Sequence, residues 1–376
     1  MTGTSCDGVD ATLVEVDAPG RRATVIDHST RPLAGRGGAL GTRLRQAREQ
    51  HALTASTMAA LAREAALEHI EAIRPLIDRH GSPDLIVLHG QTLVHAPPMS
   101  WQLCDPWPVA AAFGTRVIYD LRGADLAEGG QGAPLVPLAD WVLFRSPEPL
   151  AVLNLGGFAN VTLLPAEDQP TAAISGGDLC ACCQFLDALA QRTIGAPFDA
   201  DGARAARGSI DDSLAKAVAG ALVPRVAGSL GTDAEQLARD GLDRFLAAAG
   251  ARRLPSEDVH ATAVEGVALA IAAGMRALVE RQGAPPPRSC LVAGGGSRHL
   301  HLVGRLSAAL GLALAPTSTA GVPVESREAA AWAILGSLRD VLPITLPSVT
   351  GRRTCALIDG AEIRPSCRGV DPIHAT

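Results

Sequence analysis

The chain has 376 residues, of which 47% are hydrophobic and 19% are charged, and its net charge at pH 7 is −6. This composition is typical of a folded soluble protein, and the length predicts two domains. The acidic balance excludes a basic nucleic-acid-binding surface, and no apolar run reaches the roughly 18 residues of a membrane span. We therefore expect a cytoplasmic protein without a signal peptide that binds neither nucleic acid nor membranes.

Arginine supplies almost all of the positive charge, because Lys216 is the single lysine. A P-loop is therefore excluded, since that phosphate-binding motif requires a lysine after its last glycine. The eight cysteines are expected to be free thiols in a cytoplasmic chain of this size. The cluster "CACC" at 180–183 leaves a metal site as the less favoured alternative, because no second Cys/His pair follows at zinc-finger spacing.

The first part of the chain alternates predicted strands with a predicted helix. In chain order these are strands over 11–16 and 22–27, a long amphipathic helix over 54–78, a buried strand over 84–90 and a strand over 117–125. The last of these strands carries Asp120, Arg122 and Asp125 at its end. Such alternation predicts an α/β fold with functional groups at the strand ends.

The second part begins with two strands around a glycine turn and continues with helices. The predicted elements are a hairpin over 150–165, helices near 183–193, 211–223 and 257–282, a strand that breaks into three glycines and a helix over 289–300, a helix over 325–336, and an irregular tail over 341–376. Ser256 and Asp258 are the expected caps of the helix over 257–282. No charged linker divides the chain, which favours a packed hinge.

The opening "GTSCDGVDATLV" and the later "NLGGFANVTLL" form a weak internal repeat of a glycine turn followed by a strand. Two such hairpins are typical of clamshell enzymes, in which the turn N–H groups hold nucleotide phosphates between two lobes. The predicted division is a first lobe over 1–148, a second lobe over 149–340 and a tail over 341–376 that packs back on the lobes. Only the second copy has a strand before its turn, so we expect a further strand to precede the first copy in the natural gene product.

The first turn has the chemistry of a phosphate site, and the residues proposed for it are Gly3, Thr4, Ser5, Cys6, Asp7, Gly8, Val9 and Asp10. Its hydroxyls and tight glycine backbone suit phosphate oxygens, and Asp7 could hold Mg²⁺ through a water molecule. An ordinary hairpin turn is an equally weighted alternative, because Asp-Gly is common there.

The later glycines are candidates for the same nucleotide site. They are Gly156 and Gly157 in the second hairpin, and Gly294, Gly295 and Gly296 after the strand that begins near 289. A glycine turn lets a purine or a phosphate approach the backbone closely, although close packing of strand and helix also requires glycine. The first lobe offers hydrogen-bonding groups suited to a sugar, for which a salt-bridged loop is the alternative; they are His95, Asp120, Arg122, Asp125 and Gln131.

Several motifs together resemble the anhydro-N-acetylmuramic acid kinases. They are "MTGTSCDGVD", "GQTLVHAP", "GGQGAPLVP", "NLGGFANVT", "PFDADGARAARG", "DVHATAVEGVA", "AGGGSRH" and "REAAAWAIL". The matches follow the family order over nearly the whole chain. The resemblance implies the two-lobed α/β fold of the actin/hexokinase/Hsp70-like superfamily, with ATP in the cleft between the lobes.

The resemblance also implies a reaction. ATP would phosphorylate O6 of 1,6-anhydro-N-acetylmuramic acid, a product of peptidoglycan recycling, while water opens the anhydro bridge at C1. This chemistry requires a carboxylate base for the water, together with Mg²⁺ and backbone amides on the phosphates. The implied partners are the amino sugar and ATP, with a homodimer left open, and Glu328 joins the sugar-contacting residues.

The family's base is the first aspartate of Asp-Thr-Gly-Pro-Gly-Asn, which ungapped counting places at Asp178, with Asp187 as helix scaffold. Here "CACC" replaces the Gly-Pro-Gly-Asn part, which is unfavourable if Cys180 or Cys182 must adopt a positive φ. A shifted alignment would place Ser175 at the base position instead.

Further departures lie in the second lobe. A lysine and an arginine of the family become Ala238 and Leu242, with Arg239 and Arg244 as neighbouring substitutes, and the asparagine after the triple glycine becomes His299. Because the first lobe matches well, this pattern leaves two interpretations open. The protein is an anhydro-sugar kinase, active or impaired, or it is a sensor that closes on a sugar or nucleotide without turnover.

Overall fold

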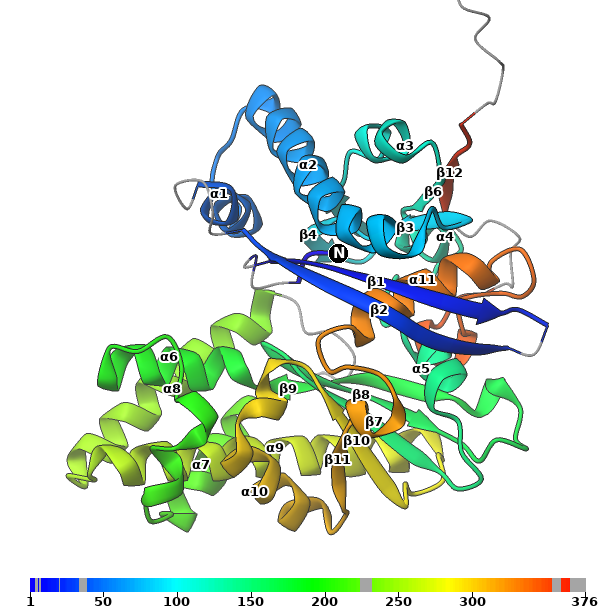
Figure 1. The fold of residues 1–376 in the computed structure, drawn as a ribbon. Helices are drawn as coiled ribbons and strands as arrows, with labels where there is room; N and C mark the ends of the chain where they lie inside the picture. Colours follow the sequence, from blue (N-terminus) through cyan, green and yellow to red (C-terminus); the bar gives the residue numbers. More distant parts are fainter. Residues whose placement is uncertain are drawn as a thin grey trace, which may run out of the picture.

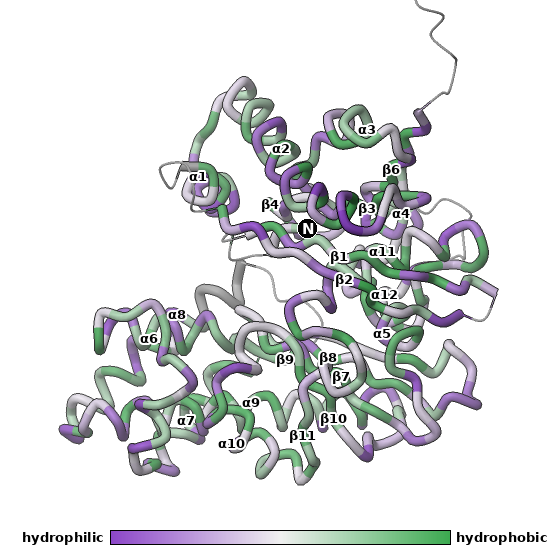
Figure 2. The backbone as a smooth tube through the Cα atoms, viewed as in Figure 1, coloured by the Kyte–Doolittle hydropathy of each residue, from purple (hydrophilic) through white to green (hydrophobic). Residues whose placement is uncertain are grey.

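The computed structural model describes residues 1–3, 6, 8–19, 21–33, 39–223, 232–353 and 360–365. The described chain forms two lobes, one above the other in Figure 1, with the β1–β2 hairpin lying along their boundary. Apolar segments concentrate in the sheet of the lower lobe and in the helix beneath it (Figure 2). The predicted two-lobed α/β class is confirmed.

The second lobe is organised by a five-stranded sheet with the order β11–β10–β7–β8–β9. Its strands are β7 (Leu150–Leu155), β8 (Phe158–Leu164), β9 (Ser175–Ala181), β10 (Ser289–Ala293) and β11 (Leu314–Pro316). β7 pairs in parallel with β10 and antiparallel with β8, so it lies at the centre of the sheet. All its residues are buried, which explains why "LAVLNL" is apolar without alternation.

Helices pack around this sheet. They are α6 (Cys183–Ile194), α7 (Asp212–Leu222), α8 (Thr232–Ala251), α9 (Ser256–Gln282) and α10 (Leu300–Leu310). α9 contacts α7, α10 and β9 and is buried along most of its length. It is the one described helix that is long and apolar enough to cross a membrane, and 67% of that apolar window is buried inside the protein.

The first lobe contains shorter sheets and a long covering helix. Its strands are β1 (Gly8–Asp17), β2 (Arg22–Pro32), β3 (Leu85–Leu88), β4 (Gln91–Ala96), β5 (Met99–Leu103) and β6 (Arg116–Tyr119). Its helices are α1 (Ala39–Arg48), α2 (Ala55–His80), α3 (Trp107–Phe113) and α4 (Leu121–Ala127). Thr2 adds an isolated antiparallel bridge to Val9 of β1. α2 covers the hairpin because the helix has one buried face, and Thr54 caps its first turn.

Two helices connect the lobes, α5 (Pro137–Phe144) and α11 (Arg327–Leu338). Asp140 of α5 and Arg327 of α11 are 0% and 3% exposed and form a bidentate ion pair. Thr162 of β8 donates its hydroxyl to the same carboxylate at 2.6 Å. This buried network joins both helices to the second-lobe sheet, and we call it the hinge; that the lobes move about it stays a prediction.

The structure corrects several boundaries. The strand predicted over 117–125 ends at Tyr119, because Asp120 caps a helix there. α11 packs against β1, β3 and α5, so it belongs with the first lobe although the predicted division placed it in the second. α9 begins at Ser256 itself, after Pro255 and without a side-chain cap, and the carboxylate of Asp258 instead accepts the Ser209 N–H.

The tail is only partly irregular. A short helix, α12 (Pro347–Thr350), is followed by β12 (Ala361–Ile363). β12 pairs antiparallel with β6, so this part of the tail extends the first-lobe sheet.

Candidate active site

Arg122 lies at the centre of a group of polar side chains between the lobes. Its guanidinium donates to the Gly132 carbonyl at 2.9 Å and lies 5.5 Å from the ring centre of Trp332. Burial lowers the pKa of Arg122 to about 10, while Glu328, Asp178 and Asp125 act to raise it. The side chain therefore keeps its positive charge at neutral pH and interacts electrostatically with carboxylates from both lobes.

Trp332 forms the support beneath Arg122. On the ring of Trp332 the His89 imidazole is stacked, with ring centres 3.9 Å apart and planes 10° from parallel. Burial and the neighbouring Arg122 keep the pKa of His89 well below its ordinary range, so the imidazole is neutral. A neutral stacked ring and a cation over an aromatic face hold the guanidinium in a fixed orientation.

The first turn of α4 positions Arg122. Asp120 adopts a left-handed conformation with φ of 53°, and its carboxylate accepts the Gly123 N–H at 3.1 Å. A side chain at position 123 would collide with that carboxylate, since a Cβ there would lie 2.7 Å from Oδ2. Asp120 is exposed, and strained residues of this kind cluster at ligand sites.

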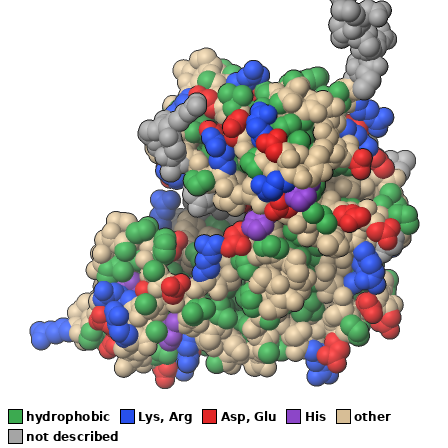
Figure 3. Space-filling view, in the orientation of Figure 1, with side chains coloured by type: hydrophobic (Ala, Val, Ile, Leu, Met, Phe, Trp, Pro, Cys, Tyr) green, Lys and Arg blue, Asp and Glu red, His purple; other side chains and the backbone are tan. Residues whose placement is uncertain are grey.

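Asp178 faces this group from β9 of the other lobe. Its side chain is accessible to water, yet burial by the surrounding protein raises its pKa from 3.8 to about 6, with Arg122 opposing the rise. Both facts are satisfied if the carboxylate lies in a water-filled recess rather than on a convex surface. Figure 3 shows a hollow between the lobes, left of centre.

A β-bulge explains how Asp178 reaches the recess. Asp178 pairs with Asn160 and Cys180 with Ala159, so Leu179 is an extra residue in β9. In a regular strand Asp178 and Cys180 would share one face, but Asp178 is exposed whereas Cys180 is fully buried. Bulges commonly redirect a side chain beside an active site.

Glu328 and Asn154 complete this group of polar side chains at the end nearest the hinge. Glu328 lies in the first turn of α11, and Asn154 is the penultimate residue of β7. The Asn154 amide donates to the Glu328 carboxylate at 3.3 Å. The end of the central strand is thus joined to the helix that carries Trp332.

His95 and Asp125, both predicted to contact a sugar, differ in their surroundings. His95 shares a hydrogen bond of 2.9 Å with the Ser100 hydroxyl, and burial together with Arg122 lowers its pKa to about 4. Asp125 is fully buried, with its two oxygens accepting the Gly132 N–H at 2.7 Å and the Thr350 hydroxyl at 2.8 Å. Asp125 therefore fixes the loop behind the site, which corrects the prediction of a direct contact.

The first turn is described only in part, because Thr4, Ser5 and Asp7 lie outside the described residues. The Cys6 N–H donates to the Gly3 carbonyl at 3.2 Å, and Cys6 is left-handed with φ of 53°. Cys6 and Val9 are each 1% exposed, so neither side chain is available to a phosphate.

Two further predicted residues sit in the same hairpin. Gly8 faces β2, since a Cβ there would lie 3.2 Å from the Arg31 carbonyl oxygen. Asp10 accepts the Thr30 hydroxyl at 2.7 Å across the hairpin.

The glycines at 294–296 divide into two kinds. A Cβ at Gly294 would lie 2.6 Å from the Asn154 Oδ1, and one at Gly296 would lie 2.7 Å from the Cys183 Sγ. A Cβ at Gly295 would meet nothing within 4 Å. Packing therefore requires two of these glycines, and Gly295 is the exposed one that a ligand could approach.

The comparisons with known proteins match this chain over almost its full length. A family model described as anhydro-N-acetylmuramic acid kinase matches residues 1–363. The chain belongs to the anhydro-N-acetylmuramic acid kinase family.

Curated relatives carry the same description. The anhydro-N-acetylmuramic acid kinase of Bordetella pertussis is 37% identical over 370 residues, which cover 95% of this chain and 93% of that protein. The one of Salinibacter ruber is 35% identical over 375 residues, covering 93% and 92%. The resemblance inferred from the motifs is confirmed.

Solved structures match at lower similarity. A ROK family glucokinase from Streptomyces griseus in complex with glucose and AMPPNP has a TM-score of 0.36 at 12% identity, covering 87% of this chain and 98% of that one. Component A of the (R)-2-hydroxyglutaryl-CoA dehydratase of Acidaminococcus fermentans has a TM-score of 0.41 at 12% identity, covering 87% and 96%.

The "CACC" departure from the kinase family pattern lies mostly in the core. Cys180 and Cys182 are fully buried, neither has a positive φ, and burial raises the pKa of Cys180 to about 12. The cysteines therefore fit the local backbone without the strain that a left-handed position would cause. Among the described residues no group of three His, Cys, Asp or Glu side chains could hold a metal ion.

The second hairpin turn pairs with the start of α6. The Cys183 N–H donates to the Gly156 carbonyl at 3.0 Å, and the Cys182 and Gln184 N–H groups donate to the Gly157 carbonyl. These N–H groups are already satisfied by the turn. The described contacts of Gly156 and Gly157 are thus structural, and a nucleotide role for these glycines stays a prediction.

The other departures also have structural explanations. Ala238 and Leu242, which replace two basic residues of the family, are 4% and 3% exposed and pack in the second-lobe core. Arg244 donates to the Asp240 carbonyl of its own helix. His299 caps α10, accepting the Leu302 N–H at 3.1 Å.

Ser175 and Asp187 differ from Asp178 in their surroundings. Ser175 is 5% exposed at the start of β9, and its hydroxyl has no partner among the described residues. Asp187 is half-buried on α6, and burial raises its pKa to about 6. Of these three residues, only Asp178 combines a raised pKa with an electrostatic interaction with Arg122.

Three residues of the site were not singled out from the sequence, namely His89, Asn154 and Trp332. Trp332 lies in an apolar helix and was indistinguishable from a core residue. His89 lies between the end of an apolar strand and Gly90, and Asn154 lies near the end of an apolar strand just before Gly156. A polar residue at the end of an apolar strand, beside a glycine, is the signal that could have found them.

Proposed function

We propose that this protein transfers the γ-phosphoryl group of ATP to O6 of 1,6-anhydro-N-acetylmuramic acid while water opens the anhydro bridge, giving the 6-phosphate. Membership of the anhydro-N-acetylmuramic acid kinase family supports the substrate and the phosphotransferase activity. The observation that carries the mechanism is Asp178, a water-accessible carboxylate with a pKa raised to about 6 that interacts with Arg122 of the opposite lobe.

The proposed reaction needs a single base, Asp178. Asp178 takes a proton from water as the water oxygen bonds to C1 of the sugar. The C1–O6 bond breaks, its electron pair stays on O6, and O6 bonds to the γ-phosphorus as ADP leaves. Because phosphorus captures O6, no separate acid has to protonate the leaving oxygen. A pKa near 6 lets the carboxylate be ionised and still basic at neutral pH.

The first-lobe residues are proposed to bind and orient the sugar. Arg122 supplies a fixed positive charge for the anionic part of the substrate, and neutral His95 can hydrogen-bond a hydroxyl or amide. Asp120 and Glu328 offer acceptors for sugar hydroxyls. Asp125 acts indirectly, by holding the loop whose Gly132 carbonyl accepts from Arg122.

ATP and Mg²⁺ are the proposed co-reactants. The exposed Gly295 offers backbone that a nucleotide could approach, and the proposed phosphate contacts of the first turn include residues outside the described range. Since the described residues provide no cluster of three metal-binding side chains, the phosphates and water would supply most Mg²⁺ ligands, which suits this cation. When bound, Mg²⁺ neutralises charge on the transferred phosphoryl group. Asp7 stays the proposed water-mediated ligand.

The test is phosphorus NMR of the reaction with ATP and 1,6-anhydro-N-acetylmuramic acid in ¹⁸O-labelled water. The expected product is a sugar 6-phosphate with the label at C1 and one ADP per sugar. Ligand-induced thermal stabilisation without any phosphate transfer would contradict the proposal and favour the sensor. The cytoplasmic location, the homodimer and the role in peptidoglycan recycling stay predictions.

A further inference from the structure

A second cavity lies at the opposite end of the β1–β2 hairpin from the first phosphate turn. It has a volume of about 380 Å³ and is separated from that turn by the ten residues of β1. A strand of that length spans roughly 33 Å, so the cavity is remote from the first phosphate turn. Its lining residues are Arg21, Leu138, Trp141, Val142, Thr171, Ala172, Leu342, Pro343, Thr345, Leu346, Pro347 and Ser348.

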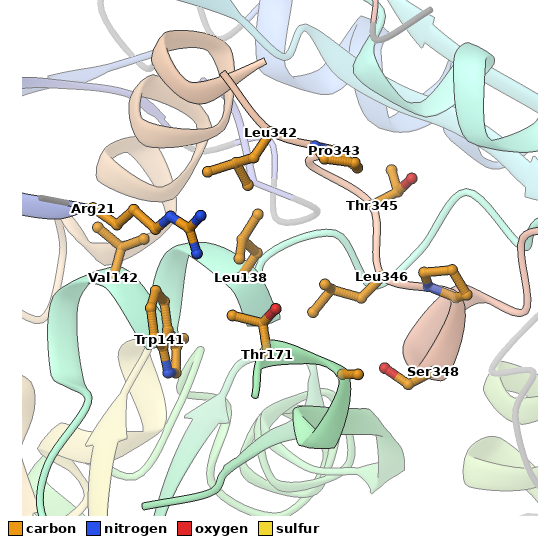
Figure 4. Close-up of a pocket in the computed structure, with 12 residues that line it drawn as sticks. Arg21, Leu138, Trp141, Val142, Thr171, Leu342, Pro343, Thr345, Leu346 and Ser348 are labelled. Carbon is orange, nitrogen blue, oxygen red and sulfur yellow. The ribbon is translucent and has the colours of Figure 1, made fainter. Parts of the chain in front are cut away.

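The walls of this cavity are mainly apolar and come from separate parts of the fold. α5 contributes Leu138, Trp141 and Val142, and the segment 342–348 of the tail faces them. Figure 4 shows Leu138, Leu346 and Thr171 around one space. The polar groups of the opposite wall are already engaged in part, since the Ser348 hydroxyl donates to the Ile174 carbonyl at 3.0 Å. An apolar body is therefore what the cavity fits.

The rim of the cavity is positively charged. In Figure 4 the guanidinium of Arg21 extends among Val142, Leu138 and Leu342. Arg145, which lies over the Trp141 ring at 4.5 Å, donates to the Arg21 carbonyl and so holds the turn against α5. Two acidic residues lie near this rim: Asp17 is the cross-strand partner of Arg22, and Glu167 interacts electrostatically with Arg145.

The rim arginines repel one another. Burial lowers the pKa of Arg145, and Arg22 and Arg21 lower it further against the opposing effect of Glu167. Within the described part of the chain, Arg21 has no ion pair with a carboxylate, whereas Arg22 has Asp17 opposite it in the hairpin. An anion placed beside Arg21 would relieve this repulsion.

We propose that this cavity binds a small amphipathic carboxylate, with its apolar body between α5 and the segment 342–348 and its carboxylate beside Arg21. The volume lies near the lower end of the range for small-molecule sites, so the ligand is a single short chain or ring. The same α5 carries Asp140 of the hinge ion pair, and the cavity walls include residues from both lobes. A bound ligand would therefore contact both sides of the hinge.

The first measurement is isothermal titration calorimetry of the full chain, without ATP or sugar, against three probes of equal chain length. Octanoate, octanol and octylammonium differ only in their head group. Octanoate is expected to bind with one site and to bind most tightly. Absence of saturable octanoate binding, or equal or tighter binding of octanol or octylammonium, would overturn the proposal.

Variants locate the site. Ala172 is exposed at the cavity wall, so Ala172→Trp fills the cavity with little effect on folding, and it should abolish octanoate binding. Arg21→Asn removes the charge at a left-handed position that asparagine tolerates, and it should weaken octanoate binding about twofold to fivefold while leaving octanol unchanged. Arg21→Lys should retain most of the affinity.

A matched control is Arg253→Asn. Arg253 is also exposed and left-handed, with φ of 54° against 50° for Arg21, but it does not line the cavity. This control should bind octanoate like the unmutated protein. Undiminished binding in Ala172→Trp, or equal weakening in both asparagine variants, would place the carboxylate elsewhere. Because every measurement omits turnover, failure of the kinase proposal would leave this result unaffected.

Discussion

The two walls of the cleft are built differently. The first-lobe wall presents side chains, with Arg122 held over Trp332 and His89 stacked behind it. The second-lobe wall presents one prominent carboxylate, Asp178, and the open backbone of Gly295. Side-chain identity therefore matters across the first wall, whereas the second wall depends on strand geometry and on that single aspartate.

This difference explains where the chain departs from its family. The "CACC" cysteines at 180 and 182, together with Ala238 and Leu242, lie beneath the second wall in the hydrophobic core. Substitutions at these buried positions act on the packing behind the face rather than on the side chains that face the cleft. These buried departures therefore do not by themselves argue against the proposed kinase activity.

The largest expected effect comes from removing the one carboxylate of the second wall. Asp178→Asn should lower turnover by about 10² to 10⁴ while ATP and sugar still bind, because the shape is kept and the basicity is lost. The measurement is steady-state kinetics beside calorimetric binding. Asp187→Asn and Ser175→Ala are the controls and should do much less. Full activity in Asp178→Asn with none in Ser175→Ala would mean that the alignment is shifted.

Stability gives an independent check on the same variant. The folded state raises the pKa of Asp178 from 3.8 to about 6, so it disfavours the ionised form. That destabilisation is absent below pH 3.8 and complete above about pH 6. The melting temperature of Asp178→Asn, relative to the unmutated protein, should therefore rise as pH rises through this window. A constant difference would show that the carboxylate is not desolvated.

The hinge that holds the walls together should be the next most sensitive feature. Arg327→Met leaves Asp140 buried without its cation, which costs about 3–5 kcal/mol of the free energy of unfolding. Replacing both partners, as in Arg327→Met/Asp140→Leu, should restore part of the lost free energy of unfolding. Denaturant unfolding measures both.

The control for the hinge is an exposed pair. Arg43 and Glu64 lie 2.8 Å apart with side chains 33% and 41% exposed, so Arg43→Met should cost about 0.2–1 kcal/mol. Equal losses at both pairs would refute the special role of the buried one.

In the glycine turn at 294–296, one glycine is required for packing and another is open to a ligand, so substitutions at the two should have different effects. Gly294→Ala should cost about 1–3 kcal/mol of stability, because φ is 80° and the new Cβ would lie 2.6 Å from Asn154 Oδ1. Gly295→Ala should leave stability within about 0.5 kcal/mol, because its surroundings are open, and it should raise the KM for ATP. An unchanged KM would reduce this turn to a packing motif.

The smallest expected effect concerns the electrostatic influence of Arg122, in the first wall, on the pKa of Asp178 in the second wall. Arg122 lowers the pKa of Asp178, so Arg122→Gln should move the acidic limb of the kcat/KM profile upward by about 0.5–1 pH unit. Arg122→Lys keeps the charge and should move it less, although both variants weaken sugar binding. A lower kcat/KM with an unmoved limb would limit Arg122 to substrate binding.

The sequence by itself determined the two-lobed class, the central apolar strand, the long helices and the family. These features depend on local periodicity and on motif order, which a linear pattern records directly. Asp178 could also be selected from the sequence, because ungapped spacing places it at the family's base position.

Only the tertiary structure decided what the candidate side chains touch. A bulge at Leu179 directs Asp178 to the recess and Cys180 to the core, while Asp125 turns inward to hold a loop. Trp332 is an ordinary apolar helix residue in the sequence and becomes the support for Arg122 only when the fold brings its ring beneath the guanidinium. Such contacts join residues that are far apart in the chain, and their direction depends on burial and register, so no local pattern specifies them.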